Sequence, residues 1–321
     1  MRVKLVGTGL HAPPRVETSA ELAPRLGRDE AWILRSVGVK RRHVAEGPPE
    51  QMAAAAAREA LGDGPPPDLV LNASVTPRQL IPDTAVFLLR ELGLDRIPGF
   101  TVHATCLSFL VALHVGASLI HAGAHKRVLI ASAEIASVGR DFSQPESAAL
   151  FGDGAGAAVL EPTPEGEASE LLAYAMITRP AGAEFTQLRG GGVHYHPNRE
   201  GARPEDNYFD MDGPSVYRLG RPLVGELLDQ LYARAGLAGP EDIDLIVPHQ
   251  ASGLAIASLR RYGFAQERVV NVLAEYGNCI AASLPMALAV ADREGRLQRG
   301  QTVLLVGTGA GLSAAALLLR W

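Results

Sequence analysis

The chain has 321 residues, 47% of them hydrophobic and 20% charged, which is enough for one large α/β unit or two domains and leaves little room for disorder. Its formal net charge of −5 gives no general attraction to nucleic acid or to an anionic membrane, so we expect neither as a partner. Two cysteines do not make a disulfide framework, and Gly9 and Pro13 come too early for the apolar segment of a signal peptide. These features predict a soluble cytoplasmic protein.

Short apolar runs alternate with longer helical runs along the chain. We expect strands at residues 3–6, 69–71, 100–102, 127–131, 157–160, 171–177, 244–247, 269–273, 302–306 and 314–319. We expect helices at residues 50–61, 85–92, 107–121, 216–235, 254–262 and 281–294. Strands that alternate with helices predict a largely parallel sheet covered on both faces.

The two halves of the chain show the same order of elements. This predicts an internal duplication, with a βαβαβαββ order in residues 1–165 and again in residues 166–321. Residues 182–212 are rich in glycine, proline and charge, and we interpret them as an insertion that covers a functional site. The segments that we align between the halves are 68–71 with 244–247, 106–113 with 279–286, 127–130 with 302–305, and 152–156 with 307–311.

Cys106 follows a predicted strand and stands where the predicted helix 107–121 begins. Unpaired N–H groups and the positive end of the helix dipole favour the thiolate, which is the nucleophilic form of cysteine. A packed core cysteine fits the same apolar helix, so the position alone does not decide. His249 and Asn278 each follow another strand-like run, and open α/β sheets place ligands at the carboxyl ends of strands. We therefore expect these three side chains to converge in a catalytic site.

Other kinds of site fit the sequence less well. The glycine clusters at 152–156 and 307–311 precede strands, whereas a dinucleotide fingerprint requires a helix after the glycines. His194 and His196 have no Cys or Glu at ligand spacing, so we expect no metal. Cys279 is expected to pack inside a helix. The order of cysteine, histidine and asparagine also suits a papain-like protease, but 105 residues precede the cysteine and the protease context is absent.

At these motifs the chain resembles the thiolase superfamily, and within it the ketoacyl synthase III group of condensing enzymes. The resemblance implies a thiolase-like five-layered αβαβα fold built from two duplicated halves, and a homodimer. It also implies thioesters of coenzyme A or acyl carrier protein as substrates, with no further cofactor. It covers nearly the whole chain and rests on residues 6–9, 30–33, 38–39, 105–106, 151–157, 247–251, 277–278 and the terminal glycine-rich turn.

The resemblance also implies a role for each site residue. Cys106 attacks an acyl thioester and carries the acyl group, and the N–H groups of Cys106 and Ala310 form the oxyanion hole. His249 and Asn278 bind the carbonyl of the second thioester and stabilise the enolate left by decarboxylation. Thiolases proper carry a second cysteine in the terminal glycine turn, and residues 307–311 hold none, which favours the synthase branch.

Several expected substrate contacts depart from the group's pattern. Ile81 replaces an aromatic residue that reaches the partner's acyl pocket, Ser252 replaces an asparagine, and Thr308 replaces an aromatic residue in the glycine turn. Trp32 and Gly213 complete the expected substrate contacts. These departures indicate a specialised biosynthetic enzyme and leave the choice between coenzyme A and a carrier protein open. The basic segments 40–42 and 260–261 are candidate docking sites for an acidic carrier.

The leading functional hypothesis is decarboxylative Claisen condensation between an acyl group on Cys106 and a malonyl thioester. One alternative is acyl transfer to an alcohol or amine, with His249 as general base. Condensation of two acyl thioesters without decarboxylation is a second alternative, and a non-catalytic subunit of a heterodimer is a third.

Overall fold

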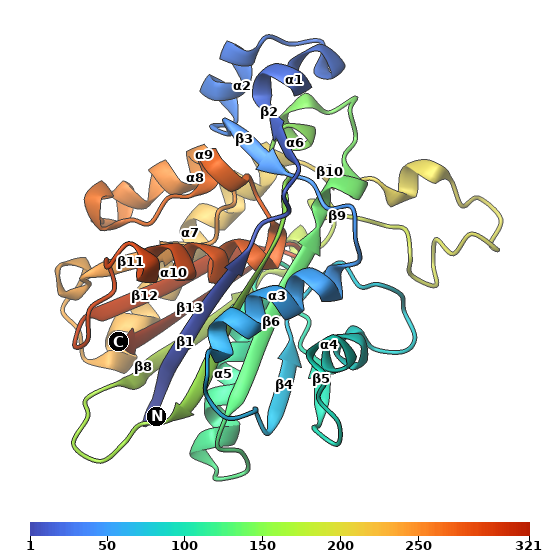
Figure 1. Ribbon diagram of the computed structural model, residues 1–321. Coiled ribbons are helices and arrows are strands. Elements are labelled where there is room, and N and C mark those ends of the chain that lie inside the picture. The colour runs from blue at the N-terminus through green and yellow to red at the C-terminus, as the bar shows by residue number, and fades with distance from the viewer.

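The computed structural model describes residues 1–321 and contains two main β-sheets (Figure 1). The first has the order β1-β7-β6-β4-β5, and the second has the order β11-β12-β13-β8. The strands of the first sheet are β1 (Val3–His11), β4 (Leu69–Asn72), β5 (Gly99–Thr101), β6 (Val128–Ile135) and β7 (Asp153–Pro162). Those of the second are β8 (Glu170–Thr178), β11 (Leu245–Pro248), β12 (Thr302–Gly309) and β13 (Ser313–Arg320).

Both sheets are mixed, which corrects the prediction of a largely parallel sheet. Strand β4 runs parallel to β5 and β6, and β11 runs parallel to β12. The antiparallel pairs are β1 with β7, β6 with β7, β12 with β13, and β13 with β8. Strand β13 follows β12 directly after residues 310–312, and β7 follows β6 through a connection whose only helices are short ones at residues 136–139 and 145–148. Neither connection contains a long crossover helix, so the second strand of each pair returns antiparallel.

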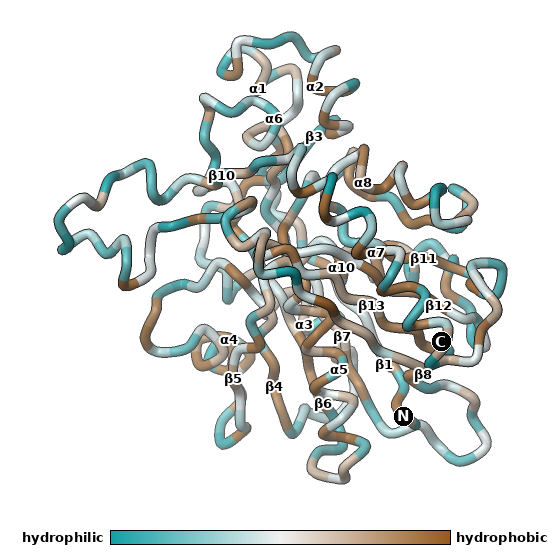
Figure 2. Tube along the Cα trace, turned by 180° about the vertical axis from the view of Figure 1, so that it is seen from behind, coloured by the Kyte–Doolittle hydropathy of each residue, from teal (hydrophilic) through white to brown (hydrophobic).

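The helices form three layers around these two sheets, which gives the predicted five-layered fold. Helices α3 (Pro49–Leu61) and α4 (Thr84–Leu92) cover the outer face of the first sheet. Helices α5 (Ser108–His121) and α10 (Ser283–Arg293) lie between the two sheets. Helices α7 (Gly213–Ala235) and α8 (Gly253–Ser258) cover the outer face of the second. Figure 2 shows apolar residues concentrated in these layers and polar residues in the outer loops.

The smaller elements lie above and beside the sheets in Figure 1. Strand β2 (Val16–Thr18) pairs with β3 (Arg41–His43), and β9 (Thr186–Gln187) pairs with β10 (Asp210–Met211) at the base of the insertion. The short helices are α1 (Ser19–Leu22), α2 (Glu30–Ser36), α6 (Pro145–Ala148), α9 (Leu273–Tyr276) and the 3-10 turn η8 (Ile280–Ala282). No helix combines the length and the apolar character that crossing a membrane requires.

The first half has the predicted βαβαβαββ order, whereas the second half lacks one strand. The strand expected at residues 269–273 is reduced to a single bridge between Val269 and Ile246, and α9 begins at Leu273. We propose that the two halves are residues 1–165 and 166–321, because each range contains one complete sheet.

The hydrogen bonds before α5 and α10 correct the alignment of the halves. Ser108 Oγ accepts the N–H of Ala104 at 2.9 Å, and Ser283 Oγ accepts the N–H of Cys279 at 2.8 Å. The residue after each donor has a positive φ, 52° at Thr105 and 45° at Ile280. The two cysteines therefore do not correspond: the structural counterpart of Cys106 is Ala281, and that of Cys279 is Ala104.

The central helices approach the sheets closely because small residues face them. A Cβ atom on Gly156 of β7 would lie 2.7 Å from the backbone nitrogen of Met286 and 2.8 Å from Cβ of Pro285, both in α10. This position has no room for a side chain, since these atoms belong to a packed helix rather than to the flexible end of a side chain.

Gly156→Ala is expected to lower the free energy of unfolding by about 1–3 kcal/mol, because the new methyl group overpacks the contact between β7 and α10. Gly225→Ala is the matched control, since its Cβ in α7 would meet only Tyr262, at 3.9 Å. This control is expected to keep or gain stability, because alanine favours a helix over glycine. Denaturant unfolding of the two variants measures the difference, and equal stabilities would contradict the packing argument.

Candidate active site

Cys106 lies in a tight turn between β5 and α5. Helix α5 begins at Ser108, so Cys106 precedes its N-cap residue, Leu107, and does not lie within the first helical turn as expected. Ser108 Oγ donates to the carbonyl of Thr105 at 2.7 Å and accepts the N–H of Ala104 at 2.9 Å, which closes the turn around the cysteine. The side chain of Ser108 thus stabilises the turn that precedes α5, while the helix itself has no side-chain cap.

The terminal glycine-rich turn between β12 and β13 meets the Cys106 turn. The backbone N–H groups of Ala310 and Cys106 lie close enough to the Cys106 sulfur to lower the pKa of its thiol. Thr105 Oγ1 donates to the carbonyl of Ala310 at 3.4 Å. A Cβ on Gly309 would lie only 2.6 Å from Thr105 Oγ1, so glycine is what lets the two turns approach.

His249 follows the end of β11 and lies beside the same turn. The backbone N–H of His249 donates to the carbonyl of Val306 at 2.8 Å. A Cβ on Gly307 would lie 2.8 Å from Cβ of His249 and 3.1 Å from Cδ2 of Leu107. The histidine and the residue after Cys106 therefore meet across one glycine.

The imidazole of His249 is held in the neutral form. The residue is only 4% exposed, and burial lowers its pKa to about 4. Its Nδ1 atom has no hydrogen-bond partner. At neutral pH the ring therefore carries one N–H donor and no charge.

Asn278 lies near His249, in the segment between α9 and η8. Its Nδ2 donates to the carbonyl of Ala251, two residues after His249, at 3.2 Å. Its Oδ1 accepts the N–H of Ile280 at 2.8 Å and the hydroxyl of Ser283 at 3.3 Å. These contacts fix which end of the amide is the donor, and they leave one of its two N–H bonds without a protein acceptor.

Strained backbone marks the same three segments. Four non-glycine residues have a positive φ, and three of them, Thr105, Ile280 and Leu312, lie within two residues of Cys106, Asn278 and Ala310. Such conformations cost free energy and persist where the surrounding structure enforces them, which is typical of active sites. The sequence gives no sign of this strain, because threonine, isoleucine and leucine are poor markers of a left-handed conformation.

The electrostatic state of Cys106 differs from the expected one. Burial raises the pKa of the Cys106 thiol to about 11, and the negative charge of Glu134 raises it further, while the N–H groups of Ala310 and Cys106 offset only part of the rise. Part of the residue reaches the surface, but its sulfur is enclosed by protein. Burial therefore favours the thiol over the thiolate in the resting site, in contrast to the thiolate expected from the sequence.

The expected substrate contacts lie on several different elements. Thr308 lies near the end of β12, just before the terminal turn, and Ser252 caps α8 by accepting the N–H of Ala255 at 3.1 Å. Trp32 lies half-buried on α2, with the guanidinium of Arg28 5.1 Å from its ring centroid. Gly213 is the first residue of α7. Ile81 is 85% exposed on the loop before α4.

The start of α8 also lies close to the end of α2. A Cβ on Gly253 would lie 3.8 Å from the Cα of Gly38 and 3.3 Å from the carbonyl of Val37. Ser252 and the segment that carries Trp32 are thus neighbours in the fold.

The structure also bears on the basic segment 40–42 and on the two histidines of the insertion loop. Arg42 is 0% exposed and donates to Ser19 Oγ at 2.9 Å, so it cannot belong to a docking surface, whereas Lys40 and Arg41 are exposed. His194 and His196 lie in the insertion loop, and no three or more His, Cys, Asp or Glu side chains are arranged to hold a metal ion.

Sequence reasoning missed Glu134, a buried acid at the end of β6. Its carboxylate is fully buried, and burial raises its pKa to about 7 although several N–H groups hydrogen-bond it. The available signal is the charge itself, since Glu134 is the only charged residue in a strand of otherwise apolar and small side chains.

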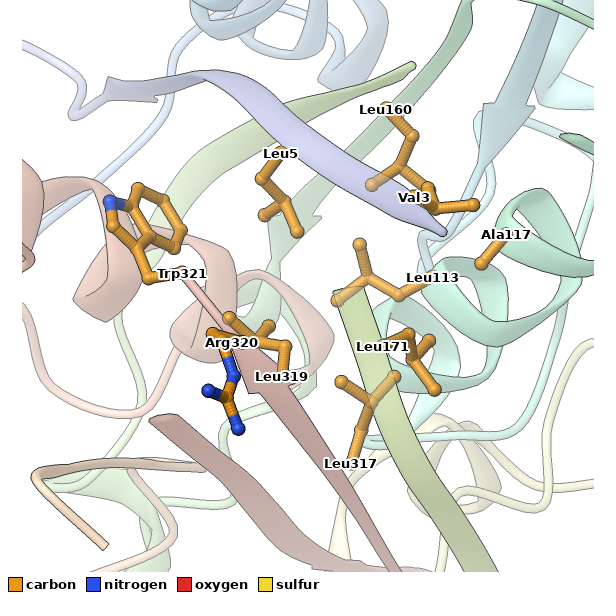
Figure 3. A pocket seen from close by; sticks show the side chains of 10 residues that line it. All are labelled: Val3, Leu5, Leu113, Ala117, Leu160, Leu171, Leu317, Leu319, Arg320 and Trp321. Atoms are coloured by element: carbon orange, nitrogen blue, oxygen red, sulfur yellow. The ribbon is translucent and has the colours of Figure 1, made fainter. Parts of the chain in front are cut away.

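The apolar gap drawn in Figure 3 lies away from these residues. It is lined by side chains of β1, α5 and β13, among them Val3, Leu113 and Leu319. Its volume of about 10 Å³ is close to that of a single water molecule. We interpret it as a packing gap between layers, too small for a substrate.

Comparison with known proteins identifies the family. Sequence models of 3-oxoacyl-[acyl-carrier-protein (ACP)] synthase III match residues 100–180 and, for the C-terminal part of that family, residues 233–321. The chain belongs to the ketoacyl synthase III family. The predicted family and fold are therefore confirmed.

Relatives match over the whole length of the chain. It is 31% identical to the beta-ketoacyl-[acyl-carrier-protein] synthase III of Koribacter versatilis, covering 100% of this chain and 98% of the relative. It is 34% identical to that of Desulfitobacterium hafniense, covering 99% and 98%. The crystal structure of 3-oxoacyl-(acyl carrier protein) synthase III from Pseudomonas aeruginosa matches with a TM-score of 0.91 and 31% identity, covering 100% and 98%. Xanthomonas campestris OleA, at 22% identity and a TM-score of 0.87, shares the fold.

The raised pKa of Cys106 makes its reactivity strongly dependent on pH. In the Cys279→Ala variant, which leaves one thiol, the rate of alkylation by iodoacetamide is expected to rise about tenfold per pH unit from pH 7 to pH 9, because the reactive thiolate is a small fraction below its pKa. Mass spectrometry of timed samples measures the rate. A rate that levels off near pH 8 would show that the thiolate forms in the resting site after all.

Proposed function

We propose that this protein is a condensing acyltransferase that loads an acyl group from a thioester onto Cys106 and condenses it with a malonyl thioester. The observation that carries the proposal is that the Cys106 turn and His249 both contact residues 307–311. At Gly307 and Gly309 these contacts are so close that a side chain larger than that of glycine would not fit. Membership of the ketoacyl synthase III family supports the same chemistry.

In the first half-reaction the Cys106 sulfur attacks the carbonyl carbon of the donor thioester. The bond from sulfur to the acyl group forms, the bond to the donor thiol breaks, and the proton of Cys106 leaves on that thiol. The N–H groups of Cys106 and Ala310 lie close to the sulfur, and we propose that they hold the oxygen of the tetrahedral intermediate. Loss of one such donor typically costs about 3 kcal/mol in the barrier.

In the second half-reaction His249 and Asn278 bind the carbonyl oxygen of the malonyl thioester. Breaking its carbon–carboxylate bond releases CO₂ and leaves an enolate, whose oxygen accepts the N–H of His249 and the free N–H of Asn278. The enolate carbon then attacks the acyl carbonyl on Cys106, the new C–C bond forms, and the Cys106 sulfur leaves and regains a proton.

The neutral state of His249 suits this step. A charged imidazolium is an acid that would protonate the enolate before the C–C bond forms, whereas a neutral imidazole donates a hydrogen bond and keeps its proton. Burial holds the pKa of His249 at about 4, so the ring stays neutral at physiological pH. The same low pKa makes it a weak general base, which disfavours acyl transfer to an alcohol or amine.

The acyl–acyl alternative requires a base in the loop before α4. Asp83 is the acidic residue there, and its carboxylate accepts the N–H of Ala85 at 2.7 Å and the hydroxyl of Thr101 at 2.7 Å. It therefore serves as the N-cap of α4, and we rank this alternative below decarboxylative condensation.

The carrier of the thioesters is proposed from the surface. Curated relatives are named for acyl carrier protein, and the exposed Lys40, Arg260 and Arg261 offer positive charge to an acidic carrier. We propose Trp32, Gly213, Ser252 and Thr308 as contacts for the thioester arm, whether coenzyme A or the carrier protein presents it, in a specialised pathway of the cytoplasm.

We also propose that the protein works as a homodimer. Strand β5 is the free edge of the first sheet, and its Phe100 is 44% exposed. Unpaired edge strands invite pairing with a second chain, and two-fold symmetry would join the two copies of β5. The exposed Leu80 and Ile81 lie on the nearby loop before α4 and would then face the partner.

The two half-reactions can be separated by mutation. Cys106→Ala is expected to abolish acyl loading, because it removes the nucleophile. His249→Ala and Asn278→Ala are expected to load Cys106 but to release CO₂ from a malonyl thioester at least about 100-fold more slowly, since each removes an enolate donor. Intact-mass spectrometry measures loading, and release of labelled CO₂ measures condensation.

Cys279→Ala is the matched control for the nucleophile and is expected to load and condense normally. Loading of Cys106 without CO₂ release from any malonyl thioester would instead favour an acyl-transfer or acyl–acyl reaction, and the mass of the product would identify which.

A further inference from the structure

Glu134 is a buried carboxylate with no ionic partner. Its residue is 0% exposed, and no Lys, Arg or His nitrogen lies within 4.0 Å of its oxygens. Burying an unpaired charge is costly unless hydrogen bonds replace its water shell. Its environment therefore has to supply donors, and the donors it has come from two separate segments.

The first segment is the loop after β4. The N–H of Val75 donates to one carboxylate oxygen at 2.7 Å, and the N–H and hydroxyl of Thr76 donate to the other at 2.9 and 2.8 Å. Thr76 Oγ1 also accepts the N–H of Ile135 at 3.1 Å. This loop continues to the exposed Ile81.

The second segment is η8, which follows Asn278. Turn η8 packs against β6, and the backbone N–H of Ala281 lies close enough to the Glu134 carboxylate to lower the pKa of its carboxyl. The preceding N–H, of Ile280, holds Oδ1 of Asn278 at 2.8 Å. Ile280 has a φ of 45°, which a β-branched residue adopts only under constraint. The Glu134 carboxylate thus lies beside the strained turn whose Ile280 N–H holds the Asn278 amide.

Glu134 also acts on the nucleophile through its charge. It raises the pKa of the Cys106 thiol, so a thiolate and an ionised Glu134 oppose each other. The ionised Glu134 carboxylate therefore does not favour acyl loading of Cys106. Any contribution of Glu134 to catalysis would be to the condensation step.

We propose that Glu134 is a positioning residue for the condensation step, where its carboxylate holds the Ala281 turn and the Val75–Thr76 loop so that the Asn278 amide faces the enolate oxygen. This inference rests on the proposed function. The role needs both oxygens as acceptors, which only the ionised carboxylate supplies. Protonation, or replacement by glutamine, puts a donor against one of the N–H groups and loosens the turn.

The charge of Glu134 changes within the physiological range. Burial raises its pKa to about 7, so the anchoring form is lost as the pH falls through 7. The groups that face it are the thiols of Cys106 and Cys279, whose pKa values burial raises, and Asp153 on β7, which faces Cys279. On α3, Glu50 is paired with Arg78 of the same loop that holds Thr76.

The decisive experiment compares the two half-reactions in Glu134→Gln. Acyl loading of Cys106 is expected to be unchanged or faster, because removal of the negative charge lowers the thiol pKa. CO₂ release from the malonyl thioester is expected to fall about 10- to 100-fold, since misplacement of a reacting group by about 1 Å can cost that much. A purely structural role would lower both rates together and would contradict the proposal, as would equal rates in variant and wild type.

Asp153→Asn is the matched control. Asp153 is also a buried carboxylate with neutral donors, accepting the N–H groups of Ala45 and Ser137 at 2.8 Å each, but its carboxylate accepts no hydrogen bond from residues 278–283. We expect the ratio of loading to condensation to stay at the wild-type value in this control. A changed ratio would show that the effect belongs to any buried acid of this region and would overturn the proposal.

The wild-type protein supplies a test that does not depend on folding of a variant. As the pH is lowered from 8 to 6, the condensation rate is expected to fall with an apparent pKa near 7. The loading rate, once it is divided by the fraction of Cys106 that is thiolate at each pH, is expected to stay constant. A condensation rate that is flat over this range would contradict the role of Glu134. Failure of the wild type to load or to condense at all would instead contradict the proposed function.

Discussion

The architecture depends on two largely buried helices. Helices α5 and α10 lie between the sheets, and the residues before them form the turns that carry Cys106 and follow Asn278. Packing on both sides fixes the axis of each helix, and glycines at 156, 307 and 309 let backbone meet backbone without intervening side chains. Catalytic groups held by such a core keep their positions because any movement disturbs both sheets at once. The strain at Thr105 and Ile280 is tolerable for the same reason.

Enclosure by this core also determines the charges in the site. Burial favours neutral forms, so it keeps Cys106 as a thiol and His249 as an uncharged imidazole, and it brings the pKa of Glu134 close to neutrality. These pKa shifts are consistent with the proposed reaction, in which negative charge develops on the substrate oxygens rather than on residues of the resting site. In the proposed mechanism the oxyanion and the enolate form beside neutral N–H donors, which need no rearrangement when the charge develops.

The sequence predicted the family, the five layers and the convergence of the Cys106, His249 and Asn278 segments, because motifs and apolar periodicity are local signals. It failed where the answer depends on three-dimensional surroundings. The helix start at Cys106 suggested a thiolate, but enclosure outweighs the dipole. Matching the two cysteines gave a register wrong by two residues, which only the Ser108 and Ser283 hydrogen bonds reveal. The run at 269–273 looked like a strand, yet it forms one bridge, and Glu134 lay beyond the end of its predicted strand.

The pairing of β1 with β7 has a consequence for how the chain reaches this fold. Val3 pairs with Pro162 and His11 with Ala155, so β1 is synthesised long before the strand with which it pairs. Pairing across such a separation is slow, because loop closure precedes the contacts that compensate for it. Until then β1 is an unpaired apolar strand, open to association with other nascent chains. We therefore expect the growing chain to be prone to aggregation, and a chaperone that shields its first strand to raise the yield of folded enzyme.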